Sequence, residues 1–259
     1  MIDAVSSRCL IAIAALTIVA RASTAGAQSP ASSTRKFEIV DNSFLVEESF
    51  NQEAGVFQNI FMWVRSREGD WQASFTQEWP LGGTAHQLSY TVPFGVSSAG
   101  NSAHAAGFGD LYVNYRYQLW AETLSRPAVS PRLSLVAPTP HEASGIGGGT
   151  FGLQLNVPAS KQFGDVYVHA NAGGVWRHQA GWTSQIAGSG IWRITPMWHL
   201  MLESFVEFDR TVIVSPGVRR GWNIGDRQIV IGAALPTARG DRRTTTALLT
   251  YFSYELPFK

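Results

Sequence analysis

Apolar and polar residues alternate with a period of two over most of the chain after residue 55. From Leu111 to Leu119 every second residue is apolar or aromatic, and Asn114 and Arg116 lie between them. Successive side chains of a β-strand point to opposite faces, so this spacing predicts strands with one apolar and one polar face. Clusters of Gly, Asp, Asn, Ser and Pro interrupt the alternation and mark turns.

The pattern predicts twelve strands, at 56–65, 71–81, 86–95, 108–121, 129–139, 151–163, 166–178, 184–195, 198–209, 212–222, 227–236 and 245–258. Their connections alternate between short turns and longer loops, of which 97–107 and 140–150 are the longest. An even number of antiparallel strands brings the two ends of the sheet to the same side. The pattern therefore predicts a meander of hairpins.

The distribution of charge separates a soluble β-domain from a barrel in lipid. Charged residues fall on the polar faces of these segments, and the apolar faces are almost free of charge. A barrel in lipid is apolar outside and polar inside, whereas a soluble domain is the reverse. The last segment places Phe252, Tyr254, Leu256 and Phe258 on one face, as the closing strand of bacterial outer-membrane barrels does, although Lys259 follows here.

We therefore expect an all-β fold, a single transmembrane antiparallel β-barrel of about twelve strands of the outer-membrane type, over residues 55–259. Tryptophans near strand ends support this, because aromatic girdles of such barrels lie at the two membrane interfaces. The expected girdle residues are Trp71, Trp79, Trp120, Trp176, Trp192, Trp198 and Trp222. The expected partners are the lipid bilayer and, through the C-terminal strand, the assembly machinery of the outer membrane.

The N-terminus has the pattern of a cleaved signal peptide over residues 1–27. Arg8 is followed by an apolar stretch at 10–20 that is short for a bilayer span, and Ala25-Gly26-Ala27 fits a cleavage site. A short membrane anchor is the alternative. The signal peptide and barrel together predict the outer membrane of a Gram-negative-type bacterium as the location.

Residues 28–54 are expected to form an N-terminal periplasmic leader. Within it, 37–54 departs from the strand pattern, because Glu47, Glu48 and Glu53 lie close to Phe44 and Phe50. This stretch predicts either an extra strand or a plug in or beneath the lumen.

Composition excludes several other classes. The formal net charge of +1 and the absence of a basic stripe argue against nucleic acid as a partner. The single cysteine, Cys9, precedes the apolar stretch of the signal peptide, so no disulfide framework is expected. No segment after residue 27 approaches 18 consecutive apolar residues, so we expect no transmembrane helix.

The candidate site is the inward face of the predicted barrel. Barrels of eight strands are filled by side chains, and those of sixteen enclose a water channel, so twelve strands predict a narrow lumen. The inward residues that would line a path for a small-molecule solute are Arg116, Arg132, Arg193, Arg219, Glu78, Glu203, Glu207, Asp110 and His169. The same charges could instead pair and fill the lumen, since opposite charges confined together tend to associate.

Catalytic chemistry has little support in the sequence. His104 and His141 lie in predicted external loops but lack the context of outer-membrane phospholipases, and there is no Gly-x-Ser-x-Gly elbow with its triad. The Gly-rich stretch 145–149 lacks the Lys-Ser/Thr ending of a phosphate-binding loop. We expect no catalytic residues, no metal and no cofactor.

Three stretches resemble a known outer-membrane barrel family, the one associated with the MetA-pathway of phenol degradation. They are QEWPL at 77–81 with HQLSY at 86–90, GFGD at 107–110 with NYRYQL at 114–119, and PRLSL at 131–135. The resemblance covers about residues 40–258, and Gly109, Asp110 and Arg116 match its most specific part. It implies a channel-like or transport role for aromatic or other small organic molecules.

The predicted function is a channel for passive passage of a small organic solute. Alternatives are a closed structural or adhesion barrel whose outer loops touch partners, a barrel-embedded hydrolase, and a soluble lipocalin-like binder.

Overall fold

The alternating segments form β-strands throughout the computed structural model. It describes residues 37–40, 43–97, 105–139, 147–208, 211–240 and 244–258, which all fall within one compact unit, Lys36–Lys259. This part of the chain contains no helix, and hence none long and apolar enough to cross a membrane. The predicted signal peptide, 1–27, lies outside the described residues.

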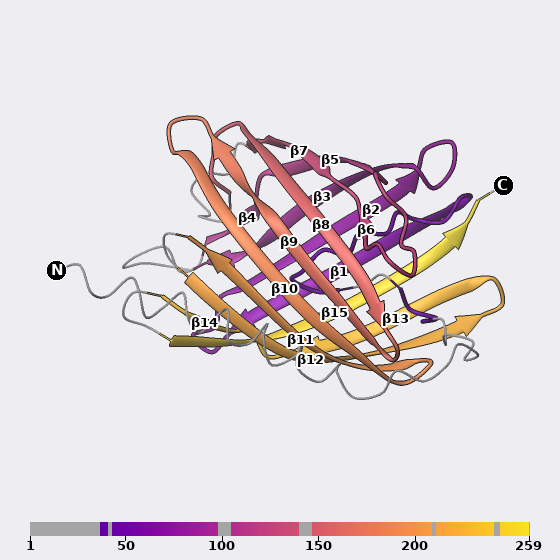
Figure 1. Ribbon diagram of the computed structural model, residues 1–259. Helices are drawn as coiled ribbons and strands as arrows, with labels where there is room; N and C mark the ends of the chain where they lie inside the picture. Colours follow the sequence, from indigo (N-terminus) through magenta and orange to yellow (C-terminus); the bar gives the residue numbers. More distant parts are fainter. Residues whose placement is uncertain are drawn as a thin grey trace, which may run out of the picture. The chain divides into compact units, whose positions relative to one another are not determined.

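Fifteen strands make a single sheet in these residues (Figure 1). They are β1 (Val56–Ser66), β2 (Trp71–Pro80), β3 (His86–Ser97), β4 (Ala105–Phe108), β5 (Leu111–Tyr117), β6 (Ala128–Val129), β7 (Arg132–Ala137), β8 (Gly152–Phe163), β9 (Val166–Arg177), β10 (Gly181–Thr195), β11 (Trp198–Glu207), β12 (Thr211–Ile224), β13 (Arg227–Ala234), β14 (Thr237–Arg239) and β15 (Thr244–Pro257).

The sheet closes on itself because β15 pairs antiparallel with β1. Val56 lies opposite Pro257 and Ser66 lies opposite Ala247, so the first and last strands, indigo and yellow in Figure 1, run side by side. Three positions around the barrel are each occupied by two short strands in succession: β4 with β5, β6 with β7, and β13 with β14. Counted this way, the barrel is closed, antiparallel and twelve strands in circumference, which confirms the predicted fold class.

At two of these three positions, a proline lies between the two short strands. Pro131 separates β6 from β7, and Pro236 separates β13 from β14. Proline has no backbone N–H, so it cannot donate to the ladder of a central strand. The alternation predicts continuous strands at 108–121, 129–139 and 227–236, and it does not show these breaks. It also predicts a loop at 97–107, whereas β3 continues to Ser97 and β4 begins at Ala105.

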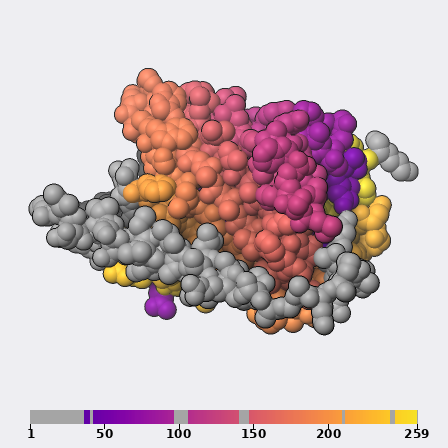
Figure 2. Space-filling view, viewed as in Figure 1, coloured from indigo at the N-terminus to yellow at the C-terminus, as the bar shows by residue number. Residues whose placement is uncertain are grey.

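The barrel is apolar outside and polar inside. On β5 and β11 the side chains of Val113, Tyr115 and Leu202 are 40%, 41% and 56% exposed, whereas Arg116 and Glu203 are 4% and 0% exposed. The outward side chains pack side by side over the strands coloured magenta to orange in Figure 2. Soluble monomers rarely expose a continuous apolar surface of this kind, which suits contact with lipid.

Residues 37–40 and 43–54 form no strand but lie inside the barrel, and we call them the inner segment. Phe37, Ile39 and Val46 are 1%, 0% and 1% exposed. The inner segment packs against inward apolar residues of the wall, including Ile191 and Leu249, and this cluster is the hydrophobic core. The core of the molecule therefore lies within the lumen.

Candidate functional site

The inner segment enters and leaves the lumen at the same end of the barrel. At its start the Ile39 carbonyl accepts a hydrogen bond from Arg219 Nη2 (3.1 Å). At its finish the Gly55 carbonyl accepts one from the Phe258 amide (2.7 Å). We call this the terminal end, because β1 begins and β15 ends there, and the opposite end the loop end.

Glu203 of β11 anchors the part of the inner segment that reaches deepest into the barrel. The backbone amides of Phe44, Leu45 and Val46 all donate to Glu203 Oε1, each over 3.1 Å. Successive amides that converge on one carboxylate oxygen form an anion-binding nest. The sequence predicts that Glu203 lines a solute path, whereas in this structure its carboxylate binds backbone amides of the inner segment.

Glu47, the residue after Val46 in the inner segment, binds polar side chains of the barrel wall. Its carboxylate accepts hydrogen bonds from Arg132 Nε (2.9 Å), Arg116 Nη1 (3.2 Å) and Asn156 Nδ2 (2.6 Å), while its own amide donates to Asn171 Oδ1 (2.8 Å). Burial opposes ionisation of this carboxyl, but the charges of Arg132 and Arg116 outweigh burial and lower its pKa below the ordinary 4.5. Glu47 is therefore ionised at neutral pH.

Arg116 of β5 binds the returning half of the inner segment at several points. Its Nε donates to Asn51 Oδ1 (2.9 Å), Nη1 to the Glu48 carbonyl (3.2 Å), and Nη2 to the Phe50 carbonyl. The planar guanidinium has five N–H donors in a fixed arrangement, which suits one side chain to several acceptors. Gln87 continues this attachment, since its Oε1 accepts the Gln52 amide (2.6 Å).

The opposite wall of the barrel receives the apolar side chains of the inner segment at glycines. A Cβ at Gly232 of β13 would lie 2.2 Å from Phe44 Cζ, and a Cβ at Gly221 of β12 would lie 2.8 Å from Ile39 Cδ1. Neither distance is compatible with the present packing. The Phe44 ring also lies 5.0 Å from that of Tyr251. The wall is thus shaped to hold this particular segment.

A cavity of about 440 Å³ lies against the inner segment, bounded by barrel strands on its other sides. Its lining is polar on one side and apolar on another. The polar part includes Glu78, Arg132 and Gln154, and the apolar part includes Met62 and Phe205. A surface of both kinds suits a small molecule with an apolar body and a few polar groups.

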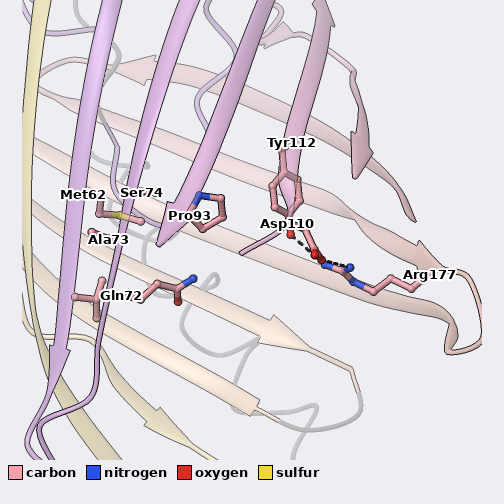
Figure 3. Close-up of a pocket in the computed structure, with 9 residues that line it drawn as sticks. Met62, Gln72, Ala73, Ser74, Pro93, Asp110, Tyr112 and Arg177 are labelled. Atoms are coloured by element: carbon pink, nitrogen blue, oxygen red, sulfur yellow. Dashed lines mark hydrogen bonds and ion pairs between the residues drawn. The ribbon is translucent and has the colours of Figure 1, made fainter. Parts of the chain in front are cut away.

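A second cavity, of about 210 Å³, lies nearer the loop end and shares Met62, Ser74 and Tyr112 with the first. Asp110 and Arg177 pair at its edge, with Arg177 Nη1 2.6 Å from Asp110 Oδ2 (Figure 3). Asp110 also accepts the amides of Gly148 (2.8 Å) and Gly149 (3.3 Å). It thereby fastens part of the β7–β8 connection to the barrel wall.

The predicted lumen residues lie at different levels along the barrel. Arg116, Arg132 and Glu78 line the larger cavity, and Asp110 lies in the smaller one. Arg193, Arg219 and His169 are buried in the terminal half, where Arg193 pairs with Asp165 (2.7 Å). Glu207 is partly buried near the loop end of β11. A role for this set in solute passage stays a prediction.

Sequence reasoning did not assign Glu47, Asn171 or Arg177 to the site. Asn171 and Arg177 occupy alternating positions of β9 and could have been found from the alternation alone. Glu47 lies in a stretch without alternation, so only its proximity to other acids and aromatic residues marked it.

The predicted girdle tryptophans lie at both ends of the barrel. Trp120, Trp176, Trp192 and Trp198 are between 36% and 53% exposed, whereas Trp71, Trp79 and Trp222 are partly buried. The prediction omitted Trp182, which is 51% exposed at the loop end. Contact of these rings with membrane interfaces stays a prediction.

No group of three or more His, Cys, Asp or Glu gathers among the described residues. His169 instead shares a hydrogen bond with Ser160 Oγ (2.7 Å) and stacks on Tyr167. His104 and His141, the residues considered for a hydrolase, lie outside the described residues.

No family model and no curated protein matches this chain. Solved structures do match, and they place its fold among the β-barrels of outer-membrane channels and porins. The COG4313 outer membrane channel from Pseudomonas putida F1 aligns with a TM-score of 0.59 and 12% identity, over 80% of this chain and 97% of that one. The KdgM porin aligns with a TM-score of 0.51 and 9% identity, over 76% and 98%.

Proposed function

We propose that this protein is an outer-membrane β-barrel channel through which a small organic solute passes passively. The predicted signal peptide would direct it to the outer membrane of a Gram-negative-type bacterium, where its apolar exterior would contact the lipid bilayer. Support comes from the inside-out distribution of side chains and from the fold shared with channels and porins.

The observation that carries this proposal is the mixed cavity of about 440 Å³ that lies against a non-covalently held inner segment. Its volume falls within the range of about 300–1,000 Å³ that is common for small-molecule sites. A protein that needed only a filled, rigid barrel would have no use for such a space. The solute would be held there before it passes the inner segment.

The inner segment occupies the lumen between this cavity and the terminal end. Passage would therefore require it to move, and its polar attachments allow this because hydrogen bonds and ion pairs can be exchanged for water. We propose that the inner segment is a plug whose displacement opens the channel. The family resemblance agrees with aromatic or other small organic molecules as the solute class.

Single-channel recording in planar bilayers tests the proposal. Wild-type protein should show small or infrequent openings, and a variant that lacks residues 28–54 should show larger and more persistent ones. Heat-modifiability on a gel must first establish that each variant is folded. If a folded barrel never conducts, in the wild type and in the deletion variant alike, the channel proposal is wrong.

A closed structural barrel is the second candidate, and the dense bonding of Glu47, Glu203 and Arg116 favours it. It predicts that displacing the inner segment changes stability but never creates conductance. The same recordings therefore separate the two candidates.

A further inference from the structure

One charged residue interrupts the apolar outer face of β12. The outward positions of this strand are the even ones, which carry Val212, Val214, Pro216, Val218 and then Arg220 and Trp222. The Arg220 side chain is exposed, and its strand neighbours are Trp198 of β11 and Ile231 of β13. A cation on a lipid-facing row is costly unless it lies near an interface or has a partner.

Two indole rings hold the Arg220 guanidinium. Its central carbon lies 5.0 Å from the ring centroid of Trp198 and 4.6 Å from that of Trp222. Both distances are within the range of cation–π attraction. Within the described part of the chain, no acidic side chain pairs with Arg220. The rings position the guanidinium through its faces and leave its N–H edges available.

The height of Arg220 on the barrel suits a membrane interface. Its neighbour Trp198 is the first residue of β11, directly after the turn at 196–197, and Arg220 lies four residues before the end of β12, so both lie near the terminal end. Tryptophan and arginine are typical of the level where lipid headgroups begin.

Two other exposed arginines at the terminal end also contact aromatic side chains, one over a ring and one through a hydroxyl group. Arg126 lies 5.7 Å from the ring of Trp120, and Arg227 Nη1 donates to the Tyr254 hydroxyl (2.9 Å). Both arginines are exposed. Three exposed cations at this end are therefore each held by an aromatic side chain, and Arg220 is the one held by two.

We propose that Arg220, between Trp198 and Trp222, is a binding site for the phosphate of a phospholipid headgroup. The guanidinium edge matches two phosphate oxygens, and its positive charge strengthens both hydrogen bonds. The flanking indoles contact the adjoining glycerol and upper acyl region, where amphipathic rings are stable. This inference rests on the membrane location in the proposed function but not on conductance.

Native mass spectrometry of the full, detergent-purified barrel titrated with phosphatidylglycerol tests the site. Losing a charge-assisted, bidentate contact in Arg220→Gln should weaken binding of the tightest lipid about tenfold or more. The matched control is Arg239→Gln, which removes an exposed arginine of β14 at the loop end and should bind like wild type. Equal lipid binding by wild type and Arg220→Gln would overturn the proposal.

Two further ligands identify what is recognised. A glycosyl diacylglycerol has the same tails without phosphate and should bind wild type and Arg220→Gln equally weakly. If it binds wild type as tightly as phosphatidylglycerol does, the site does not recognise phosphate. Inorganic phosphate should compete poorly, because it lacks the apolar part, and efficient competition would mean that the site takes the free ion.

The outcome is independent of the channel proposal. Heat-modifiability and single-channel conductance should be the same for Arg220→Gln and wild type, because Arg220 faces away from the lumen. A barrel that binds phospholipid through Arg220 but never conducts would remove the proposed channel and leave this site intact.

Discussion

At the scale of single residues, Glu203 is the most informative position in the lumen. Its carboxylate is fully buried, yet it receives three backbone amides from a segment more than 150 positions away in sequence. A buried anion is tolerated only when its hydrogen-bonding capacity is well used. Here the inner segment satisfies only Oε1, because Oε2 is buried without a hydrogen-bond partner among the described residues, so the cost of burying this carboxyl and the position of that segment depend on each other.

Substituting Glu203→Gln should loosen the inner segment. The side chain keeps its size, but the amide places an NH2 donor either at the three converging backbone amides or at the buried position of Oε2, which has no hydrogen-bond partner among the described residues, at a cost of about 1–3 kcal/mol. We expect longer and more frequent openings in planar bilayers. Glu207→Gln is the matched control, because Glu207 lies on the same face of β11 and forms no hydrogen bond with the described residues of the inner segment. Equal conductance of the two variants would contradict the role assigned to Glu203.

Ionisation of the Glu47 carboxyl makes the attachment of the inner segment to the barrel wall depend on pH. Its folded pKa is below the ordinary 4.5, because Arg132 and Arg116 favour the ionised form more than burial disfavours it. A depressed carboxyl pKa contributes stability that is complete above the ordinary value and is lost as pH falls through the folded value. The seated inner segment is therefore stabilised at neutral pH and weakened in acid.

Wild-type conductance should accordingly rise when the pH is lowered from neutral to well below 4.5, as Glu47 becomes protonated. Glu47→Gln removes the titrating group, so its conductance should already be raised at neutral pH and should change less on acidification. Recordings over that pH range check this. An identical pH profile in the two proteins would show that another group controls the response.

At the scale of elements, the fit between β13 and the inner segment depends on a glycine. A methyl group at Gly232 would overlap the Phe44 ring, and the ring has no free space because Gly217 and Tyr251 adjoin it. Gly232→Ala should therefore displace residues around Phe44 and increase conductance. Overpacked sites in proteins cost about 1–3 kcal/mol.

Two further variants make this prediction specific. Gly190→Ala is the control, since a Cβ there would meet nothing within 4 Å. Adding Phe44→Ala to Gly232→Ala should remove the overlap and make the steric effect of the methyl group small. If Gly232→Ala raises conductance equally with and without Phe44, the glycine acts through the wall and not through the inner segment.

The elements also show what the sequence could predict. Strands such as β5 and β11 could be predicted from the two-residue period of apolar and polar residues, because inward and outward positions alternate in any strand with unlike faces. Proline alone could not have placed the breaks at Pro131 and Pro236, because Pro93, Pro158 and Pro216 lie within unbroken strands. The path of the inner segment could not be predicted either, because it is fixed by contacts such as Val46 with Glu203 that leave no local periodicity. The alternation likewise identifies Arg193 and Arg219 as inward charges. It does not identify their partners, because those contacts also leave no local periodicity.

At the scale of the whole molecule, closure of β15 on β1 determines how the protein should behave in detergent. Except for the short β4 and β6, every strand of the described residues then pairs with a strand on both sides, so no long edge is open to start unfolding. We expect the protein to resist dodecyl sulfate at room temperature and to migrate differently on a gel after boiling. Cell fractionation should recover it with membranes. Recovery in the soluble periplasmic fraction with no heat-dependent shift would instead support a lipocalin-like binder.

A reversible crosslink between the inner segment and the wall would show whether motion of that segment controls passage. The Ser49 amide donates to Ser160 Oγ over 2.8 Å and both residues are buried, so this contact is the place to test a disulfide in a Ser49→Cys, Ser160→Cys double variant, whose formation is first checked by mass spectrometry. The only native cysteine, Cys9, lies in the predicted signal peptide, so no competing thiol is expected after cleavage.

The oxidised double variant should conduct less than wild type, because the disulfide ties the inner segment to β8, and a reductant added during the same recording should restore the openings. Each single cysteine variant should be insensitive to the reductant, which separates crosslinking from the loss of a hydroxyl group. Because the same molecules are compared before and after reduction, differences in folding or in amount of protein cannot produce the effect. If conductance persists unchanged through the oxidised barrel, the solute path bypasses the inner segment, and the larger cavity must open elsewhere along the wall.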